Sequence, residues 1–347
     1  MRILLVASGS GGHIYPALAF CEEAKKHHQI GFLICKNALE EKIVMDTDIE
    51  KIFIDVHPQA SYYLKHPTRW LSLTKKITKL AQKISHYDAI VAFGGFMSFV
   101  ASMSAKMAHK KLYLHEQNAV LGDGNRYALP FARKIVTVYE DLSLPKKYEK
   151  KKICLGNPRS AIAWKYKRDY VSDHPFKVLF LAGSLGSETL MEIMRKVTLQ
   201  LEEEDFLFTI ISGQKYYETC IQKKWSHHTR ILAYADDVLP RMAGSNLVIM
   251  RAGATSLSEM MTLQVPSIII PSPYVKHDHQ SENAVFLQKR ELAIVMKEKE
   301  LKEKDLKNAI LRLKNDKEAR YVLRSHMRSI TKLHASKNML EMIEDDA

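Results

Sequence analysis

Paired cysteines are missing from this sequence. Its 347 residues include four cysteines, and no two of them form a C-x-x-C pair. The four are Cys21, Cys35, Cys154 and Cys220. A disulfide framework and a structural zinc site both depend on clustered cysteines, so this scatter favours a protein of the reduced cytosol, and we expect no metal ion.

A long hydrophobic segment is also missing from the start of the chain. The apolar run from Ile3 to Ala7 is shorter than the core of a signal peptide, and it ends in a glycine-rich turn. A later segment, 89–105, carries no charge over 17 residues, which is the lower limit for spanning a bilayer. Because it contains Gly94, Gly95 and three serines, we expect a buried strand, a turn and the start of a helix.

Acidic residues are absent from the segment 56–87, within a chain of net charge +13 that calls for an anionic partner. Its six basic residues are Lys65, Arg69, Lys75, Lys76, Lys79 and Lys83. Tyr62, Trp70 and Leu71 are interleaved with them. This mixture suits an anionic bilayer surface, where each basic residue contributes about 1 kcal/mol. A solvated helix whose Trp and Leu face the core explains it equally well, and no signature of nucleic-acid binding is present.

Short apolar runs alternate with amphipathic segments along most of the chain. The first series of expected strands is 2–7, 30–35, 51–55, 89–93, 111–115 and 134–138. The second series is 176–182, 206–212, 230–233, 247–250, 267–270 and 293–295. Alternation of this kind produces parallel sheets covered by helices. The sequence therefore predicts an α/β protein of two doubly wound domains that meet within 146–175.

The first glycine-rich turn runs from Ser8 to His13, between the first strand and a helix. Ser10, Gly11 and Gly12 allow close approach of a ligand, and the N–H groups of the helix start attract anions. The order fits neither G-x-G-x-x-G nor a P-loop. The helix dipole keeps a histidine here largely neutral, as a general base requires, so His13 is a candidate base. The alternative is a histidine that only hydrogen-bonds its own loop.

A second group of polar residues, His115 to Asn118, stands at the end of the fifth expected strand. In open α/β sheets, ligands bind beyond the carboxyl ends of the strands. Consecutive hydrogen-bonding side chains at this place suit recognition of sugar hydroxyls and amides. Metal binding is the competing interpretation, but no second His/Asp cluster at ligand spacing supports it.

Two turns of the second half resemble phosphate-binding turns. Gly183 to Ser187 follows the first strand of the second series, and by itself could be an ordinary tight turn. The segment Arg251 to Glu259 is more informative, because small residues at a helix start admit a diphosphate. Glu259 then lies about one turn inside the helix, where its carboxylate can accept both hydroxyls of a ribose. The polar segment 277–284 follows shortly after.

In order and spacing these segments resemble the MurG family of glycosyltransferases, over residues 1 to about 300. The family motif G-G-x-G-G-H-x-x-P-x-L-A matches Ser8 to Ala19. G-G-[YF]-x-S and H-E-Q-N match 94–98 and 115–118. The remaining motifs match 156–158, 182–186, 251–259 and 271–284. The resemblance implies a GT-B fold with two Rossmann-like domains facing a central cleft.

The resemblance also implies a domain plan and an activity. An acceptor- and membrane-binding domain would cover 1–158 and a UDP-GlcNAc-binding domain 159–325, and a helix over 326–347 would pack back on the first. The activity would be inverting, metal-independent transfer of N-acetylglucosamine from UDP-GlcNAc to the C4 hydroxyl of the MurNAc of lipid I, giving lipid II for peptidoglycan synthesis. We expect no cofactor and a peripheral position on the anionic cytoplasmic face of the bacterial membrane.

The resemblance assigns roles to individual residues. Glu259 would hold the ribose and the backbone at Ala235 the uracil. Ser184, Ala254 and Thr255 would contact the diphosphate, and Gln280 and Asn283 the GlcNAc. Further predicted donor contacts are Ser10, Gly11, Gly12, Asn118 and Arg159. The predicted acceptor contacts are His13, Gly95, His115 and Asn118. His13 would be the base, with Glu116 in reserve.

The sequence departs from the family pattern at three places. Arg159 stands one position before the usual arginine of G-N-P-x-R. Leu185 and Ser187 replace the common Gln and Ala, and Ser281 replaces a Gln found in some members. Three rival functions remain: a transferase acting on diacylglycerol, a UDP-GlcNAc epimerase, and a basic nucleotide- or nucleic-acid-binding protein without catalysis.

Overall fold

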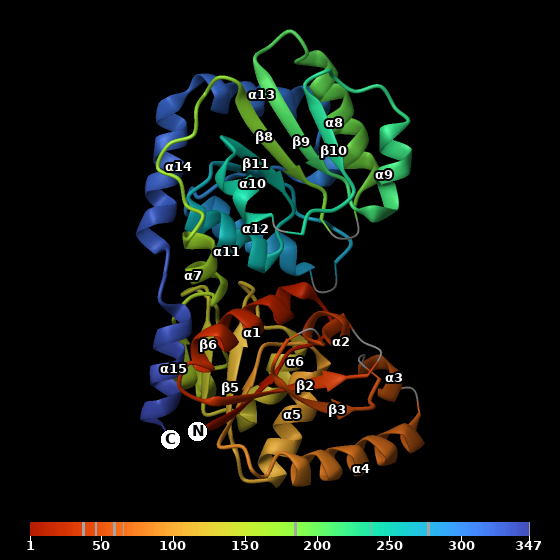
Figure 1. Cartoon of the computed structure of the whole chain (residues 1–347), viewed down its shortest axis with the longest axis vertical. Helices are drawn as coiled ribbons and strands as arrows, with labels where there is room; N and C mark the ends of the chain where they lie inside the picture. The colour runs from red at the N-terminus through yellow and green to blue at the C-terminus, as the bar shows by residue number, and fades with distance from the viewer. Residues whose placement is uncertain are drawn as a thin grey trace. The chain divides into compact units, whose positions relative to one another are not determined.

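The computed structural model describes residues 1–36, 39–45, 47–57, 60–64, 66–183, 186–236, 238–275 and 278–346. The chain folds into two compact units (Figure 1). Unit 1 comprises Met1–Ile162 together with Lys332–Ala347, and unit 2 comprises Ala163–Thr331. Each unit has its own parallel sheet.

The sheet of unit 1 has seven strands within the described residues, in the order β3-β2-β1-β4-β5-β6-β7. The strands are β1 (Arg2–Val6), β2 (Gln29–Cys35), β3 (Glu50–Ile54), β4 (Ala89–Ala92), β5 (Lys111–Glu116), β6 (Lys134–Thr137) and β7 (Lys152–Cys154). Every pairing is parallel, and Leu5 of β1 is in register with Phe32 on one side and Val91 on the other. The predicted strands are confirmed, with ends shifted by at most one residue; β7 was not predicted.

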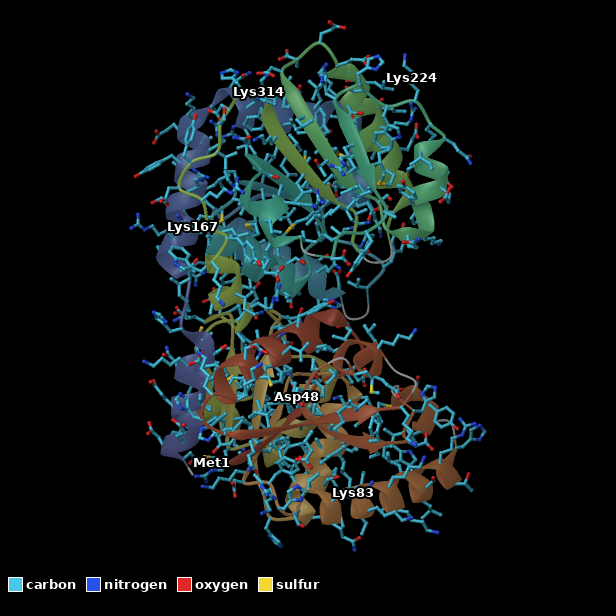
Figure 2. All side chains as sticks on the ribbon, viewed as in Figure 1. Met1, Asp48, Lys83, Lys167, Lys224 and Lys314 are labelled. Carbon is cyan, nitrogen blue, oxygen red and sulfur yellow. The ribbon has the colours of Figure 1, made fainter. Side chains whose placement is uncertain are left out.

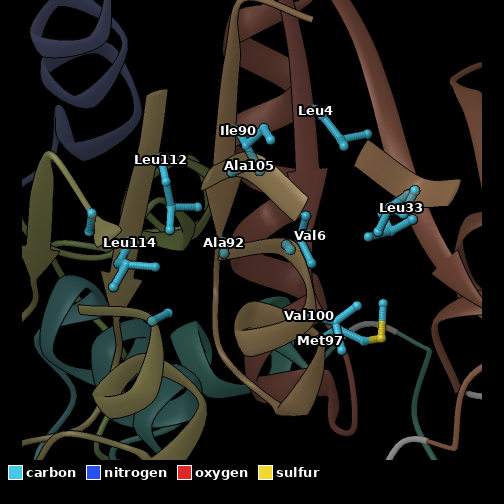
Figure 3. Packing of buried hydrophobic residues seen from close by; sticks show 14 of the residues in the cluster. Leu4, Val6, Leu33, Ile90, Ala92, Met97, Val100, Ala105, Leu112 and Leu114 are labelled. Atoms are coloured by element: carbon cyan, nitrogen blue, oxygen red, sulfur yellow. The ribbon is translucent and has the colours of Figure 1, made fainter. Parts of the chain in front are cut away.

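Helices cover both faces of this sheet. They are α1 (Gly11–Ala24), α2 (Leu39–Val44), α3 (Ala60–Leu64), α4 (Pro67–Lys83), α5 (Phe96–Met107), α6 (Asp123–Ala128), η1 (Leu129–Phe131), η2 (Lys146–Lys151) and α15 (Ala335–Asp345). Alternate residues of the apolar strands point to opposite faces. Leu4 and Val6 therefore join the cluster under α4 and α5 (Figure 3), while Ile3 and Leu5 join a second cluster under α1 and α15.

The uncharged segment 89–105 forms the buried strand β4, a turn at Gly94 and Gly95, and most of α5, as the sequence predicted. Its serines are used inside the fold: the hydroxyl of Ser98 accepts from the Gly94 N–H, and that of Ser104 donates to the carbonyls of Ile77 and Val100. Among the helices that the structure describes, none is long and apolar enough to cross a bilayer.

Unit 2 has a six-stranded parallel sheet within the described residues, in the order β10-β9-β8-β11-β12-β13. Its strands are β8 (Phe176–Leu181), β9 (Phe206–Ile211), β10 (Thr229–Leu232), β11 (Leu247–Met250), β12 (Ser267–Ile269) and β13 (Ile294–Val295). Its helices are α8 (Glu188–Gln200), α9 (Gln214–Ile221), α10 (Leu239–Ala243), α11 (Ala254–Leu263), α12 (His279–Lys289), η4 (Glu298–Glu300), α13 (Glu303–Asn315) and α14 (Lys317–Ile330). Again the predicted strands are present within one residue of their expected ends.

The chain passes between units 1 and 2 at two places. The helix α7 (Arg159–Trp164) contains the boundary between Ile162 and Ala163. The segment 326–347, expected as one helix, is divided: α14 ends at Ile330 in unit 2, and α15 begins at Ala335 in unit 1. There α15 lies beside α1 (Figure 1). It buries Met339, Leu340 and Ile343.

Candidate active site

In each sheet, the order in which successive strands are added reverses at the first strand of the unit. In unit 1, β1 lies between β2 and β4, so the turns after β1 and β4 leave the same edge side by side. In unit 2, β8 lies between β9 and β11, which brings together the turns after β8 and β11. Ligands of doubly wound sheets bind at such switch points, beyond the carboxyl ends of the strands. Within the described residues, these turns contain seven of the predicted site residues: Ser10, Gly11, Gly12, His13, Gly95, Ala254 and Thr255.

The turn after β1 leads directly into α1. Ser10 is its N-cap residue with an extended backbone, and Gly11 and Gly12 are the first two helical residues. The N–H groups of His13 and Ile14 already bond the carbonyl of Ser10. The start of a helix presents N–H groups and a partial positive charge toward the strand end, which is the arrangement that binds anions.

The ring of His13 is fixed between this turn and the turn after β4. Its Nδ1 lies 2.8 Å from the carbonyl oxygen of Ser8, and because a carbonyl only accepts, Nδ1 carries the proton. In the neutral ring the lone pair is then on Nε2. A Cβ atom at Gly94 would stand 2.8 Å from that Nε2, so only glycine leaves room for the ring.

Position 95 also requires glycine. Its φ is +77°, and a Cβ atom here would meet the Ser8 hydroxyl oxygen at 2.5 Å. Ser8 is buried, and its hydroxyl has no hydrogen-bond partner within the structure. The turns after β1 and β4 are thus packed so closely that Ser8, His13, Gly94 and Gly95 form one rigid group.

Glu116 is held by four N–H donors. Its Oε1 accepts from the backbone and side-chain nitrogens of Asn118 at 3.1 and 3.0 Å, and its Oε2 accepts from Gly122 N and Asn125 Nδ2, both at 2.9 Å. The side chain is buried. These donors occupy both carboxylate oxygens, so the geometry gives Glu116 the task of bracing the 118–125 turn rather than that of a reserve base.

His115 does not contact an acceptor in the way the sequence suggested. Its side chain is fully buried, Nε2 donates to the Gly156 carbonyl at 3.0 Å, and Nδ1 accepts from the Gln117 amide at 3.0 Å. Burial lowers the pKa of His115 to about 4, helped by the nearby His13, against the hydrogen bond to Gly156. His115 is therefore a neutral residue that links β5 to the loop after β7 by a hydrogen bond.

Asn118 and Arg159 lie nearer the surface of unit 1. The amide of Asn118 is half-buried and donates to Glu116. Arg159 starts α7, where its N–H bonds the Asn157 side chain at 3.0 Å, and its guanidinium carbon lies 5.7 Å from the ring centre of Tyr15 on α1. Ser160, at the position of the usual family arginine, is buried. Arg159 is therefore the residue that brings a cation close to the first turns of α1.

In unit 2 the turn after β11 opens α11 with Ala254 and Thr255, preceded by Gly253 in an extended conformation. Glu259 lies in the second turn of α11 and is buried. Gln280 accepts from the Ser272 N–H at 2.9 Å, which ties α12 to the loop after β12. Ala235 is nearly buried beyond the end of β10. Ser184 lies outside the described residues.

Asn283, a predicted sugar contact, lies inside unit 2. It is fully buried, and its Nδ2 donates to the Ala252 carbonyl at 3.0 Å. The side chain therefore has no surface to offer a sugar, and it instead stabilises the turn that starts α11. Within the described ranges there is no group of three or more His, Cys, Asp or Glu side chains arranged to hold a metal ion.

Two acidic residues near these turns were not predicted. Glu298 in η4 forms a buried ion pair with Arg251, with 2.8 Å between Arg251 Nη1 and Glu298 Oε2. Glu40 in α2 is fully buried, and no side chain of the described residues hydrogen-bonds either of its carboxyl oxygens. Neither residue belongs to a local motif. Their importance follows from tertiary packing, which a single sequence does not reveal.

Comparison with known proteins identifies the family. The model of the glycosyltransferase family 28 N-terminal domain matches residues 3–137, and that of the family 28 C-terminal domain matches residues 177–341. A UDP-N-acetylglucosamine–N-acetylmuramyl-(pentapeptide) pyrophosphoryl-undecaprenol N-acetylglucosamine transferase of Pediococcus pentosaceus is 29% identical over 99% of both chains. The transferase of the same name from Leuconostoc mesenteroides is 31% identical over 88% of both chains.

Solved structures agree on the fold. The crystal structure of Acinetobacter baumannii MurG superposes with a TM-score of 0.80 at 21% identity, covering 99% of both chains. A putative UDP-N-acetylglucosamine 2-epimerase from Listeria monocytogenes reaches 0.68 at 12% identity, covering 99% of this chain and 96% of the other, which shows that this fold alone does not select the reaction. The chain has the GT-B fold, and by its match to full-length relatives it belongs to the MurG family of glycosyltransferases.

Proposed function

We propose that this protein transfers N-acetylglucosamine from UDP-GlcNAc to the C4 hydroxyl of the MurNAc-pentapeptide of lipid I, forming lipid II for peptidoglycan synthesis. The observation that carries the proposal is the similarity, over 99% of both chains, to a relative named for this transfer. The glycine-rich turns at the switch points of both sheets support it, because they supply N–H groups for phosphate-bearing ligands.

His13 is the proposed general base. The Ser8 carbonyl keeps the proton on Nδ1, so Nε2 can take the proton of the acceptor hydroxyl as its oxygen attacks the anomeric carbon. A new C–O bond forms while the bond between the anomeric carbon and the UDP oxygen breaks. Attack from the face opposite the leaving group inverts the anomeric configuration. The products are the lengthened glycolipid, UDP and a protonated His13.

Negative charge that develops on the leaving UDP needs donors that are already in place. We assign this task to the N–H groups at the start of α11, around Ala254 and Thr255, and to Ser184. Fixed dipoles of this kind can replace a divalent cation, so we propose a metal-independent transfer. Glu259 would hold the ribose, the backbone at Ala235 the uracil and Gln280 the sugar. Asn283 stabilises this site indirectly, through its hydrogen bond to the Ala252 carbonyl.

Unit 1 supplies the remaining proposed contacts. Ser10, Gly11 and Gly12 offer the first turn of α1 to a phosphate, and Arg159 adds a positive charge beside it. Asn118, held by Glu116, is the proposed contact to sugar hydroxyls. Gly95 packs directly against Ser8, so there is no room for a side chain at this position.

We further propose that α4 binds the cytoplasmic face of the membrane. Its buried side carries Leu73, Ile77 and Leu80, so the apolar stripe of the helix faces the core. Yet Leu71 is 68% exposed and Trp70 37% exposed. The surface also bears Lys75, Lys79 and Lys83, the last of which is labelled at the end of α4 in Figure 2. Exposed apolar and basic side chains on one short helix suit the interface of an anionic bilayer. Lys65 lies outside the described residues.

The test is release of UDP from UDP-GlcNAc by the purified protein, with and without a lipid I analogue, in EDTA. Lipid-dependent release that survives EDTA is the expected result. Release without any lipid, together with an epimerised sugar, would favour the epimerase reaction of the fold relative. Release with diacylglycerol but not with the lipid I analogue would move the acceptor to another glycolipid class. Folded protein that binds UDP but releases none with either acceptor would contradict the proposal.

A further inference from the structure

A buried ion pair lies next to the turn that opens α11. Arg251 Nη1 is 2.8 Å from Glu298 Oε2, and Nη2 is 3.2 Å from Oε1, so the guanidinium and the carboxylate meet in a two-point contact. Their side chains are 10% and 7% exposed. Nη1 also donates to the Ile270 carbonyl at 3.2 Å. Two-point contacts between arginine and a carboxylate fix orientation as well as distance.

The same carboxylate holds the turn after β8. The hydroxyl of Ser187 donates to Glu298 Oε1 at 2.9 Å, while its oxygen caps α8 by accepting from the Leu190 N–H at 3.4 Å. A Cβ atom at Gly183 would lie 3.2 Å from Arg251 Cγ, so the arginine stem packs directly along the glycine turn.

Glu298 therefore joins three segments that the sequence keeps far apart. One is the turn after β8, the second is the turn after β11, and the third is η4 after β13. The first two turns flank the switch point of the unit 2 sheet, where a diphosphate would lie. A buried carboxylate at this junction sets both the direction of the Arg251 charge and the spacing of the two turns.

We propose that Glu298 is a positioning residue for the nucleotide diphosphate. Its carboxylate holds the guanidinium of Arg251 in place, and it also holds the turn after β8 through the hydroxyl of Ser187. The inference rests on the proposed function and deepens it for the donor side. Glu298 does not touch the reacting atoms. Its effect is transmitted through Arg251 and the two turns, so it belongs to the binding of UDP and not to proton transfer.

The test compares Glu298→Gln and Ser187→Ala with a matched control, Glu300→Gln. Glu300 stands on the same short helix but is exposed and paired with Lys297. Calorimetry gives the affinity for UDP alone, and the transfer assay gives KM and kcat. Loss of a charge-assisted contact predicts about tenfold weaker UDP binding and an equal rise in the KM for UDP-GlcNAc in Glu298→Gln. Ser187→Ala should lose about threefold, with kcat, the acceptor KM and the Glu300→Gln control unchanged.

A second comparison covers the case in which Glu298→Gln folds poorly, because it leaves a buried arginine without its counter-ion. Arg251→Met removes that charge, and adding Glu298→Met to it should weaken UDP binding by no more than the roughly threefold loss of Ser187→Ala if the rest of the Glu298 effect passes through Arg251. A lower unfolding temperature with unchanged UDP affinity would reduce Glu298 to a structural role. Tighter UDP binding would mean that it competes with the diphosphate. Either result overturns the inference, whereas a wild-type protein that binds no UDP overturns the proposed function itself.

Discussion

The orientation of the His13 ring decides which of its nitrogens can act. With Nδ1 donating to the Ser8 carbonyl, a neutral ring has its lone pair on Nε2. Replacement by alanine removes this acceptor without touching the helix N–H groups. We expect His13→Ala to lower kcat by about 100-fold or more, the usual effect of losing a general base, with little change in the KM for UDP-GlcNAc. Initial rates of lipid-dependent UDP release measure both.

The matched control is His227→Ala, because His227 is exposed and outside the four turns. It should keep the wild-type kcat. His13→Ala with nearly full kcat would remove His13 from the role of base. In that case Glu116 would not be the next candidate, since four N–H donors already occupy its oxygens.

Glu40 gives a prediction about pH. Burial raises the pKa of its carboxyl above the usual range, against weaker opposition from the backbone N–H groups of Glu40 itself, Gly9 and Cys35. Because the folded pKa is above the unfolded one, ionisation costs stability as the pH rises through this interval, and the cost stays constant above it. Glu40→Gln should therefore unfold at a higher temperature at pH 7.5, by about 2–4 °C for each 1 kcal/mol relieved.

Thermal unfolding between pH 4 and 8 is the measurement. The gain of Glu40→Gln over the wild type should shrink toward zero on acidification below the unfolded pKa. Glu41→Gln, on the same helix but half-buried, should not reproduce the gain of Glu40→Gln at pH 7.5. A Glu40→Gln protein that is less stable at pH 7.5 would mean that the ionised carboxylate has a partner in solution.

Two predicted site residues show what sequence reasoning cannot assign. His115 and Asn283 were predicted contacts because polar side chains stood where strands or helices meet the expected crevice. In the structure both are fully buried and bond backbone carbonyls, of Gly156 and Ala252 respectively. A motif shows which residues are near a site. Whether a side chain faces the ligand or the scaffold depends on packing that the motif does not contain.

The elements followed the periodicity closely where both faces of a strand are buried. The exception is β7, three half-buried residues at the sheet edge next to a lysine-rich turn. An edge strand with Lys at its start lacks the apolar run that identifies the others. The break between α14 and α15 was also missed, because the lysine- and glutamate-rich segment has no glycine or proline to end a helix at Ile330.

At the scale of a single helix, the testable prediction concerns membrane binding by α4. Lys75 and Lys79 lie on its exposed side, and each basic residue near an anionic surface contributes about 1 kcal/mol. Lys75→Ala/Lys79→Ala should therefore bind phosphatidylglycerol vesicles about 30-fold more weakly, with no change in the rate on a short-chain, water-soluble acceptor. Sedimentation with vesicles gives the partition coefficient.

The control is Lys302→Ala/Lys304→Ala, an equal loss of charge at the start of α13. If both pairs weaken vesicle binding alike, net charge explains the attraction and α4 has no special role. Equal binding by all variants would favour the other interpretation of the sequence, a solvated basic helix.

At the scale of the whole molecule, the chain is two units with separate cores. Unit 1 is filled by clusters on both faces of its sheet, and unit 2 by a cluster around Phe180, Ile249 and Ile310. The sequence placed the change of domain within 146–175, and the structure has it between Ile162 and Ala163. The family resemblance predicts a C-terminal helix that packs back on the first domain, and in the structure α15 belongs to unit 1 and adds Met339, Leu340 and Ile343 to its core.

Separate cores predict two unfolding transitions with different sensitivities. Ile343 of α15 and Ile310 of α13 are both fully buried, one in each unit. Replacing either by alanine should cost about 2–5 kcal/mol in its own unit. UDP at 100 times its Kd should stabilise unit 2 alone by about 2.7 kcal/mol, because a ligand stabilises only the unit that binds it.

Scanning calorimetry with and without UDP distinguishes the units. Ile343→Ala should lower the transition that UDP leaves unchanged, and Ile310→Ala should lower the one that UDP raises, by about 5–10 °C in the wild type. Since α15 is part of the core of unit 1, loss of its packing in Ile343→Ala should leave UDP binding intact. A single transition that both substitutions lower and UDP raises would mean that the units unfold as one body. UDP raising the transition that Ile343→Ala lowers would move the nucleotide to unit 1 and overturn the proposed assignment of donor and acceptor.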